Sequence, residues 1–154
     1  MLELDPKTGY LPPGEHEATL TQLQEVFATN LRRKEIMTGL RRILAMLLAK
    51  DVKRVWVDGS FVTDKMRPSD VDVVFEPGPS DDVTSWGPLA PAGRLNLKHL
   101  YRVDLWAHPS PQPNRVGPGT KPIVEWFKTD RDGVPKGIVK LDLAENWEEI
   151  HDSK

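Results

Sequence analysis

The chain has 154 residues, which suits one folded domain over residues 1–154 with its own hydrophobic core. Charged residues make up 29% of the chain and the formal net charge is −2, which argues against coating nucleic acid through net charge alone. The absence of cysteine excludes disulfides and thiolate metal sites. Because neither a signal peptide nor a membrane-spanning apolar run is present, we expect a cytoplasmic protein with no membrane partner.

The first part of the chain predicts an extended segment followed by two helices. Residues 1–18 are rich in proline and glycine and are expected to form an extended lead-in packed over the domain. Thr19 or Thr21 can cap a helix that runs to about Thr29, and apolar spacing predicts a second helix from about Leu31 to Ala49. The basic side chains of this second helix are interpreted as a solvated face, with steering of RNA or a triphosphate as the alternative: Arg32, Arg33, Lys34, Arg41 and Arg42.

A strand expected at Arg54 to Val57 leads into Gly59 and Ser60. Glycine lets the backbone approach a phosphate closely, and free N–H groups at a helix start at Ser60 would attract an anion. This indicates a phosphate-binding turn, while an ordinary turn is the alternative. Lys65 and Arg67, in the charged loop that follows, are further candidate phosphate ligands, with ordinary surface-loop side chains as the alternative.

The next strand, expected from Asp70 to Phe75, carries two carboxylates one residue apart. Because strand side chains alternate, Asp70 and Asp72 project from the same face of the strand. Carboxylates this close raise each other's pKa unless a cation neutralises them. Mg²⁺ takes its oxygen ligands from one or two carboxylates together with substrate phosphates. The pair therefore predicts a divalent metal site, with an acidic strand edge facing water as the alternative.

A third carboxylate strengthens the prediction of a metal site. A long loop from Pro77 to about Lys98 is expected to precede a strand from Tyr101 to Trp106, which contains Asp104. If this strand lies beside the first acidic strand, at the usual spacing of about 4.8 Å, Asp104 joins the other two aspartates. Three carboxylates can hold two metal ions about 3.5 to 4 Å apart, as in phosphoryl and nucleotidyl transfer.

The rest of the chain completes an α+β fold. A loop from Pro109 to Pro122 precedes a helix that begins near Thr120 and continues through Phe127. A final strand is expected at Gly137 to Leu143, followed by an acidic tail at 145–154. We expect a small mixed β-sheet that carries the acidic residues at one edge and packs the two N-terminal helices on one face.

The segment from Arg54 to Trp106 resembles the DNA polymerase beta-type nucleotidyltransferase superfamily. The shared pattern is an apolar strand ending in Gly-Ser, an Asp-x-Asp strand and a later strand with a single aspartate. The small size resembles the minimal members, some of which act in toxin–antitoxin systems. Asp58 departs from the pattern, because an apolar or aromatic residue is expected before Gly-Ser.

The resemblance implies a nucleotidyltransferase fold and a set of residue roles. Gly59 and Ser60 would bind the nucleoside triphosphate, ATP among the candidates. Asp70, Asp72 and Asp104 would be the catalytic residues and would ligate two Mg²⁺ ions, or Mn²⁺ in their place. Asp104 would also assist deprotonation of the acceptor.

The implied reaction moves a nucleoside monophosphate from an NTP to a hydroxyl of RNA, such as tRNA, or of a partner protein. A toxin–antitoxin or phage-defence setting would follow from the same resemblance. Two alternatives stay open, a non-catalytic antitoxin or regulatory module with the same fold and a metal-dependent nuclease. Arg94 and His99 match the short signature of an all-helical ribonuclease family, but they precede a strand, so we attach no function to that match.

Overall fold

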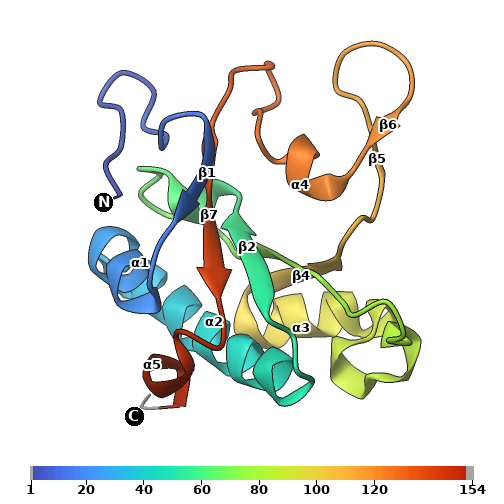
Figure 1. Ribbon diagram of the computed structural model, residues 1–154. Helices are drawn as coiled ribbons and strands as arrows, with labels where there is room; N and C mark the ends of the chain where they lie inside the picture. The colour runs from blue at the N-terminus through green and yellow to red at the C-terminus, as the bar shows by residue number, and fades with distance from the viewer. Residues whose placement is uncertain (1, 152–154) are drawn as a thin grey trace.

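A mixed β-sheet of five strands forms the centre of the computed structural model, which describes residues 2–151 (Figure 1). The strands lie in the order β1-β7-β2-β3-β4. The two outer pairs, β1 with β7 and β3 with β4, are parallel, while β2 is antiparallel to both of its neighbours. The strand bounds are Gly14–Glu17 (β1), Arg54–Asp58 (β2), Val71–Phe75 (β3), Val103–Ala107 (β4) and Gly137–Asp142 (β7).

Helices cover the two faces of the sheet unequally (Figure 1). One face carries α1 (Leu20–Phe27), α2 (Leu31–Ala49), α3 (Arg94–Tyr101) and α5 (Trp147–His151). The other face carries the short helix α4 (Ile123–Trp126), next to a hairpin of β5 (Gln112–Pro113) and β6 (Thr120–Lys121). Three short 3₁₀ segments lie between β3 and α3: η2 (Val83–Ser85), η3 (Gly87–Leu89) and η4 (Pro91–Gly93).

The two predicted N-terminal helices are confirmed, and their starts follow from their caps. Thr19 and Gln22 form a capping box at α1, each side chain bonding the other's backbone N–H. Asn30 caps α2 by accepting from the Arg33 N–H. Both helices pack on the sheet as expected, so the α+β class with a mixed sheet is confirmed.

Strand alternation divides the core into two layers. Val55, Val57, Val71 and Val73 point toward the four-helix face and join the main core. Their neighbours point the other way, where the second layer packs under α4: Trp56, Val74, Ile123, Val124, Phe127 and Ile138. By strand alternation, the side chains of Asp58, Asp72 and Asp104 point to the same side as this second layer. They therefore project from the sheet face opposite α1, α2, α3 and α5.

Four predicted boundaries are wrong. The lead-in contains strand β1, and the loop predicted up to Lys98 contains the start of α3. Tyr101 ends α3 instead of opening a strand, because Arg102 adopts a left-handed conformation that stops the helix before β4. Thr120 belongs to β6, so α4 begins only at Ile123.

Arg33 was expected on a solvated face, and this expectation is wrong. The side chain is buried and donates hydrogen bonds to the backbone carbonyls of Phe27, Phe61, Thr63 and Lys65. A guanidinium supplies five donors in a fixed fork, which suits several carbonyls at once. Arg33 thus ties α2 to the loop that follows Gly59 and Ser60.

Of the helices within residues 2–151, none combines the length and apolar character needed to cross a bilayer. Residues 1 and 152–154 of the predicted lead-in and tail lie outside the described residues. Within the described part of the tail, α5 packs against α2 through the buried Ile150.

Candidate active site

Three aspartates lie in register across three neighbouring strands. Asp58 on β2 is the Cα partner of Asp72 on β3, and Asp72 is in turn the partner of Asp104 on β4. Paired residues in a sheet project to the same side, so the carboxylates form a line that we call the acid row. Asp70 lies just before β3, two residues from Asp72, and flanks the row. The predicted adjacency of the two acidic strands is therefore confirmed.

Gly59 allows the backbone to pack closely against the acid row. Its φ of +82° lies in a region that L side chains rarely adopt, and a Cβ atom here would overlap Oδ2 of Asp72. The glycine thus allows the backbone after β2 to lie against the central carboxylate. Ser60 begins the 3₁₀ helix η1 (Ser60–Val62), as the predicted helix start requires.

Asp58 is the most buried member of the acid row. Its side chain is fully buried, and neither carboxylate oxygen has a hydrogen-bond partner among residues 2–151. Burial first, and the neighbouring charge of Asp72 second, raise its pKa well above the ordinary value. A buried acid without a partner is costly, so this position calls for either a proton or a cation.

Asp72 occupies the centre of the row and is also strongly perturbed. Burial raises its pKa to about 7, with further contributions from the charges of Asp70 and Asp104. Lys136, partly buried just before β7, lowers the pKa of both Asp58 and Asp72 and so opposes these effects. Burial lowers the pKa of Lys136 itself.

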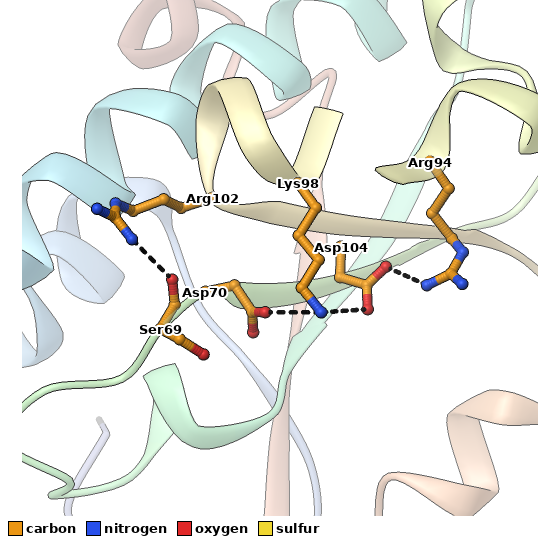
Figure 2. A network of polar contacts seen from close by, with 6 residues as sticks. All are labelled: Ser69, Asp70, Arg94, Lys98, Arg102 and Asp104. Carbon is orange, nitrogen blue, oxygen red and sulfur yellow. Dashed lines mark hydrogen bonds and ion pairs between the residues drawn. The ribbon is translucent and has the colours of Figure 1, made fainter. Parts of the chain in front are cut away.

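Two basic side chains of α3 face the Asp104 end of the acid row, as Figure 2 shows. Arg94 Nη1 lies 2.7 Å from Asp104 Oδ1, and the guanidinium carbon lies 4.2 Å from the centre of the Trp106 ring. Lys98 Nζ lies 3.3 Å from Asp70 Oδ2 and 3.8 Å from Asp104 Oδ2. Because Arg94 and Lys98 are one turn apart, they share a helix face. The Asp70 charge is the main cause of a raised pKa for Lys98.

The carboxylates fit a hard cation by chemistry, although they do not converge on a single point. Within residues 2–151, no three acidic, histidine or cysteine side chains meet closely enough to hold a metal ion. The buried, unpartnered carboxylate oxygens of Asp58 are nevertheless hard oxygen donors of the kind that such a cation takes. Asp70 and Asp104 are turned toward Lys98 and Arg94 instead.

The predicted site residues fall into two groups. Gly59, Asp72 and Asp104 are brought together, with Asp70 and Ser60 at the margins. Lys65 and Arg67 lie on the exposed loop before β3, and no ion pair joins either one to the aspartates in the described part of the chain. Their phosphate-binding role stays a prediction.

Sequence reasoning missed three site residues. Asp58 was noted only as a departure from a pattern, although its place directly before Gly59 signalled that it would reach the strand end. Arg94 and Lys98 fall within the loop that the sequence predicts from Pro77 to about Lys98. The spacing of Arg94, Leu97, Lys98 and Tyr101 is helical, and that spacing was the available signal.

One family model, described as "Family of unknown function (DUF6932)", matches residues 2–142. No curated protein and no solved structure matches the chain.

Proposed function

The chain belongs to the DUF6932 family, whose function is unknown, and from the acid row we propose that it is a Mg²⁺-dependent nucleotidyltransferase. It would transfer a nucleoside monophosphate from an NTP to a hydroxyl of RNA or of a partner protein. The observation that carries the proposal is the in-register row Asp58, Asp72 and Asp104 beside the Gly59 turn. Carboxylates next to a glycine turn suit a metal-bound triphosphate better than a purely structural role.

The proposed reaction forms one bond and breaks another. The acceptor oxygen bonds to the α-phosphorus, the bond from that phosphorus to the bridging oxygen breaks, and pyrophosphate leaves. The proton of the acceptor hydroxyl passes to a carboxylate of the site. Bound Mg²⁺ would lower the pKa of the acceptor hydroxyl and neutralise the triphosphate.

The residues of the chain supply position and charge. Asp70, Asp72 and Asp104 would hold the cations, and the bound positive charge would favour the charged form of the buried Asp58 behind Asp72. Gly59 and Ser60 would bring backbone N–H groups to the phosphates. Positioning and charge neutralisation dominate catalysis of phosphoryl transfer, so a single lost carboxylate should matter greatly.

The test is transfer of label from each NTP, marked at its α-phosphate, into RNA and protein of a bacterial lysate with Mg²⁺. Asp72→Asn should reduce transfer by at least about a thousandfold, because it removes charge stabilisation at the reacting centre. Its fold should be retained, because asparagine matches the shape of aspartate and removes a buried charge. Circular dichroism and thermal melting check that condition.

Asp132→Asn is the matched control, because Asp132 is an exposed aspartate in the 130–133 turn. It should transfer label like the natural chain. Full transfer by Asp72→Asn would overturn the proposed mechanism. Degradation of the lysate RNA, with no transfer of label and no pyrophosphate release, would indicate the nuclease alternative instead.

A non-catalytic module is the second candidate, and one observation favours it. Arg94 and Lys98 already pair with Asp104 and Asp70, which is how a purely structural acidic cluster would be neutralised. No label from any NTP, with folded protein that does not bind Mg²⁺, would support this second candidate.

A further inference from the structure

Lys98 places a positive charge between two carboxylates of the site (Figure 2). The side chains of Asp70 and Asp104 are 14% and 9% exposed, whereas that of Lys98 is 43% exposed. The ammonium therefore reaches the carboxylates from the solvent side. A divalent cation bound to Asp70 and Asp104 would either occupy the position of this ammonium or lie close to it.

A cation and the Lys98 ammonium compete for the same oxygens. Like charges this close repel strongly where water is partly excluded. Both ionic contacts of Lys98 found among residues 2–151 are to site carboxylates, so a metal that takes these carboxylates leaves the ammonium without a partner. An anion that approaches from the solvent side would give the ammonium a new partner.

Arg94 is held differently. Its guanidinium bonds Asp104 Oδ1 at 2.7 Å and also stacks over the Trp106 ring, so part of its attachment does not depend on a carboxylate. Lys98 is a flexible lysine with one compact charge, which can swing from carboxylate to phosphate at small cost. Of the two α3 cations, Lys98 is the one suited to change partners.

We infer that Lys98 is a polyphosphate-binding residue that, in the free protein, competes with the divalent cation for Asp70 and Asp104. The inference rests on the proposed function, because the anion that enters with the metal is then a triphosphate. The consequence is coupling: the metal alone binds weakly, and the metal with a polyphosphate binds strongly, because only then does every charge have a partner.

Two probes test the coupling by isothermal titration calorimetry: Mn²⁺ alone, and a preformed complex of Mn²⁺ with inorganic tripolyphosphate. In Lys98→Met, removal of the competing ammonium should make Mn²⁺ alone bind about fivefold more tightly. Loss of the phosphate contact should make the complex bind about fivefold more weakly. Lys50→Met, at an exposed lysine beyond the end of α2, is the charge-matched control and should behave like the natural chain.

Opposite shifts for the two probes support the inference, because general damage to the site would weaken both. Unchanged or weakened Mn²⁺ binding in Lys98→Met overturns it, as does unchanged binding of the complex. Lys98→Arg should keep the coupling. If Lys98→Met fails to fold, the affinities of the natural chain still test the inference. Equal affinity for Mn²⁺ alone and for the complex overturns it.

The binding and label-transfer experiments can fail independently. Opposite shifts in the two affinities, without any label transfer, would support the role of Lys98 and show that the proposed nucleotidyl transfer is wrong. Label transfer with unchanged affinities in Lys98→Met would remove the role of Lys98 and leave the proposed function standing.

Discussion

Asp72 couples the stability of the fold to pH. Its pKa in the folded protein is about 7, against an ordinary value of 3.8, because burial and neighbouring carboxylates disfavour its charge. The folded state therefore binds this proton more tightly than the unfolded chain does. The resulting stabilisation is complete below pH 4 and is lost as the pH rises to about 7, by at most about 1.4 kcal/mol per pH unit.

We expect Asp72→Asn to flatten this dependence. Urea unfolding between pH 4 and 8, with a chelator present, should show the variant gaining stability relative to the natural chain as the pH rises. Asp58 acts in the same direction, so a residual slope should persist. A variant with an unchanged slope would show that Asp72 is not a responsible group.

At the residue scale, the sequence predicts features that a local pattern specifies better than features that depend on contacts between distant segments. Alternation on a strand sufficed to find Asp70, Asp72 and Asp104. Asp58 was missed because its place in the candidate site comes from its register with Asp72. That register depends on a strand pairing that no local pattern specifies. Arg33 was missed for a related reason, since three of the four carbonyls that it bonds, those of Phe61, Thr63 and Lys65, lie 28 to 32 residues away.

At the scale of elements, α2 and α3 approach each other at Gly39. A Cβ atom here would overlap the carbonyl oxygen of Tyr101, the last residue of α3. Glycine inside a helix costs about 1 kcal/mol relative to alanine, so close packing is the physical reason for it at this position. The orientation of α3, which carries Arg94 and Lys98, thus depends on a glycine of another helix.

Gly39→Ala should lower the stability of the fold by up to roughly 2 kcal/mol, although alanine favours the helix by about 1 kcal/mol. The added methyl meets backbone, which cannot turn aside, and overpacking of this kind costs about 1 to 3 kcal/mol. Thermal unfolding measures the change. Thr38→Ala, at the exposed neighbouring position, should leave stability unchanged or slightly higher, and a stabilised Gly39→Ala would contradict the packing argument.

Elements with a clear apolar pattern were predictable, and elements without one were not. The helix at Leu31–Ala49 matches its prediction because nineteen residues carry a repeated apolar stripe. The α3 helix has eight residues, one buried residue and no side-chain cap at Gly93, so its local signal is weak. Strand β1 reads Gly-Glu-His-Glu, and only its pairing with β7 reveals it as a strand.

At the scale of the whole molecule, the first strand closes one edge of the sheet. Residues 2–18 bring β1 against β7 and bury Leu2 and Leu11 in the main core. Their removal should cost roughly 4 kcal/mol from the two leucines alone. It would also expose β7 as an unpaired edge, which favours association between copies.

A chain that lacks residues 2–18 should therefore melt at a lower temperature and elute as larger species in size-exclusion chromatography. An insertion of four glycine or serine residues after Val116, 82% exposed in the β5–β6 hairpin, is the control. It should change neither property, because the backbone there supports no part of the large sheet. A monomeric truncated chain with natural melting would show that β1 is dispensable.

The strand order β1-β7-β2 also has a consequence for synthesis on the ribosome. β7 is the last strand of the sheet to be made, yet it lies between β1 and β2, which are made much earlier. The strands of the acid row, β2 to β4, can pair while the chain is still growing, whereas β1 has no partner until β7 emerges. Insertion of β7 between β1 and β2 is thus the step that completes this sheet.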